Sequence, residues 1–223
     1  MLFHVERLLN EEALQAADRV LASAPFVAGG TARVFGDGAK PVLYADRSKT
    51  PDIQALDSLV VKAITGHAVI RAAALPKKVL TPLYCRHEPG MDSRLQQAPA
   101  LIGDPGQVRS DVAVTVFLSA PETYDGGEVL VQGGGEEARV KLARGHAMVY
   151  DAGFFHRVMP VARGVRLSAV TWVQSLVKDP SQREMLLDLD RVARRLSSSG
   201  PDSDEARLTV KSYGNLFRMW AEV

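Results

Sequence analysis

The stretch "RSDVAVTVFLSAPETYDGGEVLV", residues 109–131, decides the fold class of this chain. It contains two short runs rich in β-branched residues, "VAVTVFLS" and "GEVLV", separated by Pro121, Asp125 and two glycines. Runs of this kind favour strands, and the residues between them favour turns. We therefore predict that the chain is built around antiparallel β-structure.

The same pattern extends in both directions, over residues 79–177, and helical patterns flank it. Further strand-like runs are "VLTPLYCRH", "ARVKLARGHAMVYDA" and "VRLSAVTWVQSLV". Regular short strands with turns between them are typical of a barrel or sandwich. Residues 9–23 have apolar side chains at helical spacing behind Asn10, and residues 50–70 repeat the pattern with Thr50 as the expected cap.

We predict a single domain, 1–223, in three parts. Residues 1–78 form an N-terminal helical support, 79–177 the β-rich core, and 178–223 a C-terminal helical extension. The serine-rich break at 197–204 leaves about twenty residues after it, too few for a core of their own. The C-terminal helices offer a surface through which a homodimer is possible.

Composition narrows the function classes. The chain has 223 residues, 46% of them apolar and 24% charged, with a formal net charge of +1. Lys and Arg are scattered without a basic stripe, so we expect no nucleic-acid partner. No window reaches the length of a membrane span, so we expect no membrane partner. Cys85 is the single cysteine, which excludes an internal disulfide and fits a cytoplasmic location.

His156 and Arg166 are the first candidates for a site. In "FFHRVMPVARGVR", residues 154–166, ten positions separate them, which allows a strand, a turn at residues 162–164 and a returning strand. Both side chains could then enter one barrel mouth. Imidazole is a ligand for iron, and guanidinium binds carboxylates through two parallel hydrogen bonds. A structural histidine and a surface arginine are the alternative reading.

The flanking segments carry a resemblance. The stretch 109–131, followed by "VKLARGHAMVY", "HRVMPVARGVRLSAVTWVQSLVKDPSQREMLLDLD" and "YGNLFRMWAEV", resembles the bacterial PKHD-type hydroxylases, which are prolyl-4-hydroxylase-like Fe(II)/2-oxoglutarate oxygenases. The resemblance runs from about Val79 to the C-terminus. It implies an α+β fold, a double-stranded β-helix (jelly-roll) barrel with supporting N- and C-terminal helices. It also implies Fe(II) and 2-oxoglutarate as cofactors, with His156 on the metal and Arg166 on the far carboxylate of 2-oxoglutarate.

The stretch "RHEPGMDSRLQQAPAL", residues 86–101, departs from that family's pattern. The family places a Tyr-His-x-Asp-Asn-Ala motif here, and without gaps it falls on residues 95–100. Gln96 then stands in place of the histidine ligand and Ala98 in place of the aspartate. An amide oxygen is a weak metal donor and a methyl group is none, so this departure argues against ordinary hydroxylation.

Three explanations stay open. His87 or Asp92 could replace the missing ligands, although His87 lies nine residues before Gln96, roughly 30 Å along an extended strand, and a surface histidine and a turn aspartate are the plainer readings. The metal site could be remodelled, or catalysis could proceed without metal. The protein could instead be a pseudoenzyme that binds a carboxylate ligand or a protein partner. The substrate, whether a small molecule or a protein, is not identified by the sequence.

Three other side chains have structural interpretations. Asp151 either orients the His156 ring through a hydrogen bond or simply forms a turn. Arg109 and Asp111 are expected to form an internal ion pair. Cys85, in an apolar run, is expected to be a buried small residue rather than a nucleophile.

Overall fold

The structure is a computed structural model that describes residues 1–28, 42–103, 107–133, 135–200 and 202–222. Its largest element is an antiparallel sheet of eight strands in the order β1-β12-β8-β15-β5-β3-β2, with β4 also paired to β15. These strands are β1 (Leu2–Val5), β2 (Phe26–Ala28), β3 (Leu43–Ala45), β4 (Pro76–Val79), β5 (Leu83–His87), β8 (Val112–Phe117), β12 (Ala147–Asp151) and β15 (Arg166–Ser175).

A smaller sheet faces the main one. It has the order β11-β10-β13, formed by β10 (Val129–Gly133), β11 (Glu136–Val140) and β13 (Phe155–Val158). Two separate strand pairs complete the β-structure, β9 (Tyr124–Gly126) with β14 (Val161–Gly164) and β6 (Leu101–Ile102) with β7 (Val108–Arg109). A short 3-10 helix, Pro121–Thr123, precedes β9. The two facing antiparallel sheets form the predicted jelly roll.

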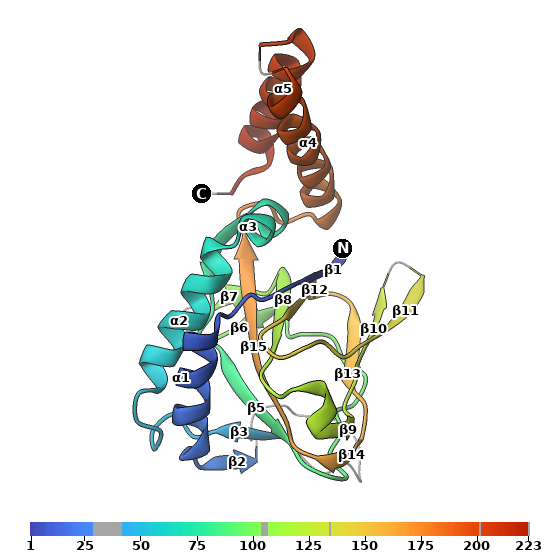
Figure 1. Ribbon diagram of the computed structural model, residues 1–223. Helices are drawn as coiled ribbons and strands as arrows, with labels where there is room; N and C mark the ends of the chain where they lie inside the picture. Colours follow the sequence, from blue (N-terminus) through green and yellow to red (C-terminus); the bar gives the residue numbers. More distant parts are fainter. Residues whose placement is uncertain (29–41, 104–106, 134, 201, 223) are drawn as a thin grey trace.

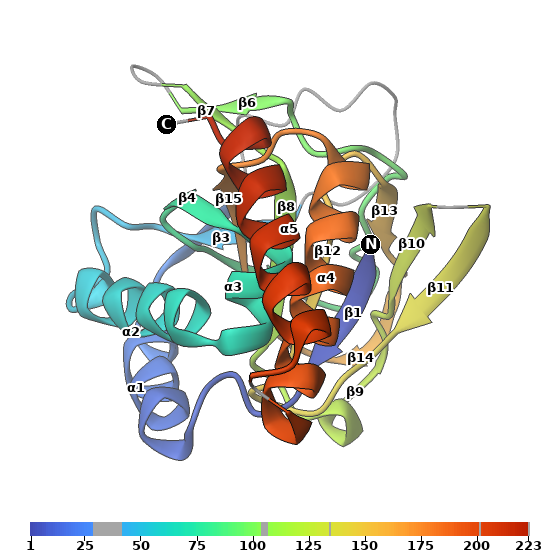
Figure 2. The same cartoon turned by 90° about the horizontal axis from the view of Figure 1, so that it is seen from above.

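Helices cover the other face of the main sheet and one end of the molecule. Helices α1 (Glu11–Ala22) and α2 (Ile53–Gly66) lie along that face, with α3 (Ala68–Ala74) following α2 (Figure 1). Helices α4 (Pro180–Ser199) and α5 (Asp204–Trp220) pack against each other as a pair next to α3 (Figure 2). The α+β fold class is therefore confirmed.

Strand β8 is apolar except for Thr115 because both of its faces are covered. Val112, Val114 and Val116 belong to the core cluster shared with the helices. Ala113 and Phe117, on the opposite face, belong to the cluster shared with the smaller sheet. Successive side chains of a strand point to opposite faces, so a strand covered on both faces has no solvent-facing positions to fill with polar residues.

Three local predictions were wrong or incomplete. The helix expected over 50–70 begins after Asp52 and is divided at His67, while the Thr50 hydroxyl donates to the Asp46 carbonyl instead of capping. The turn expected at 162–164 is part of β14, which pairs with β9. Residues 1–78 supply β1 to β4 as well as helices, so helical support describes that segment incompletely.

The C-terminal helix pair, α4 and α5, has exposed apolar side chains. Val192, Leu208 and Met219 are exposed apolar side chains on α4 and α5, and a homodimer through this pair stays a prediction.

Among the described helices, none alone has the length and hydropathy of a membrane span. Helices α2 and α3 reach that length and hydropathy only together, and they are bent by 75° at their junction.

Candidate functional site

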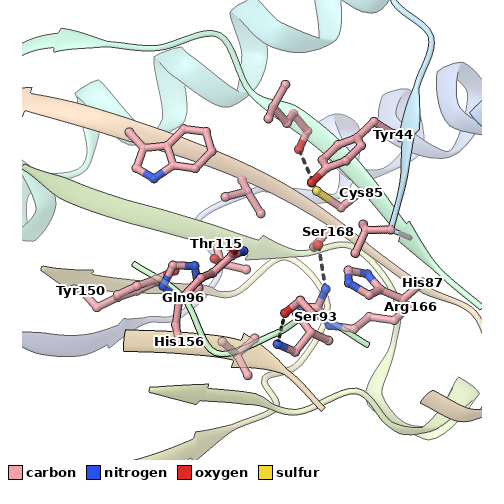
Figure 3. Close-up of a pocket in the computed structure, with 16 residues that line it drawn as sticks. Tyr44, Cys85, His87, Ser93, Gln96, Thr115, Tyr150, His156, Arg166 and Ser168 are labelled. Atoms are coloured by element: carbon pink, nitrogen blue, oxygen red, sulfur yellow. Dashed lines mark hydrogen bonds between the residues drawn. The ribbon is translucent and has the colours of Figure 1, made fainter. Parts of the chain in front are cut away.

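A cavity of about 110 Å³ lies between the main sheet and the smaller sheet (Figure 3). Its walls come from β3, β5, β8, β10, β12, β13, β15 and the segment before β6. The described residues that line it are Val42, Tyr44, Leu83, Cys85, His87, Ser93, Gln96, Thr115, Val129, Tyr150, His156, Val158, Arg166, Ser168, Val170 and Trp172. Both sequence candidates, His156 and Arg166, are therefore in one cavity.

Strands β5 and β15 supply much of the cavity wall through their register. Arg166 pairs with His87, Ser168 with Cys85 and Val170 with Leu83, and all six residues line the cavity. Because alternate residues of a strand face the same side, the sequence "RLSAVTW" presents Arg166, Ser168, Val170 and Trp172 to the cavity. This alternation is a signal in the sequence from which Ser168 and Trp172, absent from the predicted site, could have been identified.

Arg166 is a buried cation with unused hydrogen-bond donors. Its residue is 1% exposed, and its Nη1 donates to the Ser168 hydroxyl at 2.8 Å. By distance and angle its Nε and Nη2 have no hydrogen bond among the described residues, and the nearby Tyr124 hydroxyl, also without such a bond, is a neutral group close enough to interact with the guanidinium as a hydrogen-bond partner. Burial lowers the pKa of Arg166, an effect opposed by Tyr124, Cys85 and Tyr150, yet arginine stays protonated in proteins. A buried, partly unpaired guanidinium is unfavourable unless an anion joins it.

His87 lies beside Arg166 on the neighbouring strand. It is 3% exposed, so its interpretation as a surface histidine was wrong: β5 is an interior strand of the sheet, between β15 and β3. Neither ring nitrogen has a partner within the described parts of the chain. Burial, together with the charge of Arg166, lowers the pKa of His87 to about 3, so the ring is neutral at ordinary pH.

Gln96 and His156 are held opposite each other by backbone hydrogen bonds. The Gln96 amide donates to the His156 carbonyl at 3.0 Å and the His156 amide to the Gln96 carbonyl at 2.8 Å. The Ser93 amide likewise donates to the Val158 carbonyl at 3.0 Å. The segment around Gln96 therefore runs antiparallel to β13, and both the Gln96 and His156 side chains reach the cavity (Figure 3).

The His156 ring is held by Tyr150 and by the loop before β13. The two rings meet edge to face with centroids 5.4 Å apart, and His156 Nδ1 lies 3.3 Å from the Phe154 carbonyl oxygen. Burial lowers the pKa of His156, and the contact with that carbonyl opposes the shift. At ordinary pH this ring is therefore neutral as well.

Asp151 does not orient His156. One of its carboxylate oxygens accepts from the Gly153 amide at 3.0 Å, as a turn aspartate does, and the other accepts from Arg183 Nη2 at 2.8 Å. The interpretation of Asp151 as a partner of the His156 ring was therefore wrong, and its turn reading is the observed one. Arg183, on α4, is instead tied to the loop that leads to His156.

The substitute metal ligands do not gather at the cavity. His87 lines it, but Asp92 is not among the described lining residues. Within the described ranges, no group of three or more His, Cys, Asp or Glu side chains is placed to hold a metal ion. Ala98 packs on the apolar cluster between the sheets, where its methyl group fits the surroundings.

Two structural interpretations are confirmed. Arg109 Nε donates to Asp111 at 2.7 Å, and the other Asp111 oxygen accepts from the Ser175 amide at 2.8 Å. Cys85 is buried, and burial raises the pKa of its thiol to about 12. A thiol that stays protonated is a poor nucleophile and a poor metal ligand.

Comparison with known proteins agrees with this architecture. Residues 181–222 match the family model described as the PKHD-type hydroxylase C-terminal domain. A PKHD-type hydroxylase of Burkholderia ambifaria is 37% identical over 227 aligned residues, covering 100% of both chains. One of Paraburkholderia phymatum is 45% identical over 166 residues, or 73% of each chain.

Solved structures show the same fold at low identity. A Pseudomonas putida prolyl-4-hydroxylase matches with a TM-score of 0.53 and 18% identity, over 78% of this chain and 92% of that one. A Trichoplax adhaerens prolyl hydroxylase matches with a TM-score of 0.57 and 14% identity, over 82% and 86%. These matches confirm the jelly-roll fold of 2-oxoglutarate-Fe(II) oxygenases, and the full-length relatives confirm the resemblance found in the sequence: the chain belongs to the PKHD-type hydroxylase family.

Proposed function

We propose that this family member binds a small carboxylate in the cavity through Arg166 and that this binding does not require iron. The observation that carries the proposal is the state of Arg166, which is fully buried in the cavity wall, where it meets the neutral Tyr124 hydroxyl but no anion, and has two donor nitrogens without a well-formed hydrogen bond among the described residues. A guanidinium with two free donors can hold a carboxylate through parallel charge-assisted hydrogen bonds. The bound carboxylate would then supply the negative charge and the hydrogen-bond acceptors that the buried guanidinium lacks.

The residues present do not fit the iron that the family implies. A ferrous oxygenase site combines two histidines with one carboxylate and keeps open positions for its substrates. Here His156 faces Gln96, a neutral amide, and the described residues that line the cavity include neither Asp nor Glu. This donor set supports a degenerate metal site, so no oxidation step is assigned to the protein.

The same residues fit a carboxylate well. The Arg166 guanidinium already has its orientation fixed by Ser168 and by the Phe117 ring, whose centroid lies 5.4 Å from the guanidinium carbon. An arginine held in one orientation loses little conformational freedom when a ligand arrives. The pocket therefore supports binding, as in a pseudoenzyme, more directly than it supports catalysis.

The test is calorimetric titration of the metal-free protein with 2-oxoglutarate and with hexanoate. We expect saturable binding of at least one of them, unchanged when Fe(II) is added without oxygen, and lost in Arg166→Met. The matched control is Arg163→Met, which removes an exposed arginine that pairs with Asp125 at 2.7 Å and should leave binding unchanged. Circular dichroism would verify that both variants fold.

Two outcomes would contradict the proposal. The first is a protein that binds neither carboxylate. The second is binding that appears only with Fe(II), particularly if 2-oxoglutarate is then converted to succinate, because that would establish oxygenase chemistry at a site that lacks the expected ligands.

A further inference from the structure

We propose that the cavity selects a monocarboxylate with an apolar body. The carboxylate is bound between Arg166 and His87, and the body lies along Val170, Leu83 and Trp172. This inference rests on the proposed function, since it needs Arg166 to bind an anion, and it adds the chemical class of the ligand.

Along the cavity wall, the cross-strand pairs of β5 and β15 change from polar to apolar. The first pair is Arg166 with His87, the second Ser168 with Cys85, and the third Val170 with Leu83. Trp172 follows on the same face of β15 and also lines the cavity. The third pair is four residues along the strand from the first, which corresponds to about 13 Å. An elongated ligand along these strands therefore meets charge at one end and hydrocarbon at the other.

Burial follows the same direction. Arg166, His87 and Ser168 are buried and form the closed end of the cavity. Val170 and Trp172 are half-buried, and Leu83 is 36% exposed, so these three residues form the mouth. A ligand would enter at the mouth with its carboxylate first. Its apolar body would then cover the exposed apolar surface of Val170, Trp172 and Leu83. Covering that surface is favourable in proportion to its area.

His87 completes the closed end. Its two ring nitrogens have no partner among the described residues, and its strand position is directly opposite Arg166. A neutral imidazole has one N–H donor, so His87 can donate to the second lone pair of a carboxylate oxygen that Arg166 already holds. One bound carboxylate would thus satisfy donors on both strands.

The charge balance opposes a second carboxylate. Of the described residues that line the cavity, Arg166 alone carries a permanent positive charge. The remaining wall consists of neutral polar groups and of apolar side chains such as Val129, Val158 and Val170. A dicarboxylate would place its second charge there without a cationic partner, and a buried unpaired charge is strongly unfavourable.

The experiment is a calorimetric comparison on the metal-free, full-length chain. The monocarboxylates are butanoate, hexanoate and octanoate, and the dicarboxylates are succinate and 2-oxoglutarate. We expect affinity to rise from butanoate to hexanoate, because each buried methylene adds apolar contact, and hexanoate to bind about tenfold more tightly than either dicarboxylate.

Two variants test the two ends separately. Leu83→Gln should weaken hexanoate several-fold and leave succinate unchanged, whereas Leu101→Gln, at another exposed strand leucine outside the cavity, should change neither. His87→Leu should weaken both classes of ligand. A melting curve for each variant would separate loss of binding from loss of fold.

The results separate the selectivity for monocarboxylates from the binding of any carboxylate through Arg166. If 2-oxoglutarate or succinate binds as tightly as hexanoate through Arg166, the selectivity is wrong and carboxylate binding stands. If Leu83→Gln leaves hexanoate binding intact, the apolar body does not lie on the proposed wall. If no carboxylate binds at all, both the inference and the proposed function fail.

Discussion

The two sides of the cavity differ in the chemistry that their residues offer. On one side Arg166 lies beside His87 as a fixed cation with unused donors. On the other side His156 lies beside Gln96, with no carboxylate among the described lining residues. Both sides rest on the same jelly-roll scaffold, and both have well-formed backbone pairing. The comparison teaches that one jelly-roll scaffold can present a cationic wall and a neutral wall to the same cavity, because side chains rather than the fold set the chemistry of a site.

The largest expected effect concerns the loop that positions His156. Arg183 is 2% exposed and pairs with Asp151, the last residue of β12, after which that loop begins, and removing one partner of a buried ion pair costs about 3–5 kcal/mol. Arg183→Met should lower the free energy of unfolding by that order, measured by urea denaturation. Arg191→Met on the same helix, whose pair with Asp188 is exposed, should cost less than about 1 kcal/mol. Equal losses in both variants would contradict the anchoring role.

The next effect tests the difference between the two sides directly. Gln96→His together with Ala98→Asp restores an imidazole and a carboxylate beside His156, and we expect Fe(II) affinity to rise by on the order of a hundredfold. Each single change should recover less. Anaerobic Fe(II) titration provides the measurement.

The control for the rebuilt site is Arg166→Met in the same double variant, which should weaken carboxylate binding and leave Fe(II) binding mostly intact. Tight, stoichiometric Fe(II) binding by the unmodified protein would overturn the comparison, because it would mean that the described cavity residues already suffice for metal.

An effect of similar size is expected from pH at the closed end. The pKa of His87 falls from 6.5 to about 3 on folding, so protonation favours the unfolded chain. The stabilisation is complete above pH 6.5 and is lost as pH falls toward 3, by about 1.4 kcal/mol per pH unit. His156 contributes with the same sign because burial lowers its pKa too. Urea denaturation between pH 7 and pH 4 should therefore show a shallower decline in His87→Leu than in the parent protein. Identical slopes would contradict the buried, neutral state of His87.

The smallest expected effect is that of a chelator. Two core clusters pack α1 to α3 and the two sheets together through apolar contacts that need no metal, so removing metal should leave the melting temperature nearly unchanged. A decrease of more than about 10 °C would mean that metal contributes substantially to folding and that a metal site has been missed.

Much of the fold was predictable from local sequence patterns. The runs in residues 109–131 predicted strands, and the helical spacing behind Asn10 predicted α1, whose cap is observed as a hydrogen bond from the Ala13 amide. These features depend on neighbouring residues, so the sequence contains the needed information. The strands β1 to β3 were missed because each has only three or four residues, and pairing with distant strands rather than local propensity defines them.

The sequence by itself determined which chemical groups are available: an amide at Gln96, a methyl at Ala98, an imidazole at His156 and a guanidinium at Arg166. These identities alone argued against an ordinary iron site. The tertiary structure decided where those groups meet.

Only the tertiary structure revealed that His87 is buried beside Arg166 with its nitrogens unpaired, and that Asp151 binds Arg183 instead of His156. The reason is that burial and cross-strand neighbours arise from register between segments far apart in the chain. A one-residue change in that register would turn each side chain to the opposite face of the sheet, and no local pattern around His87 or Asp151 records which register the strands adopt.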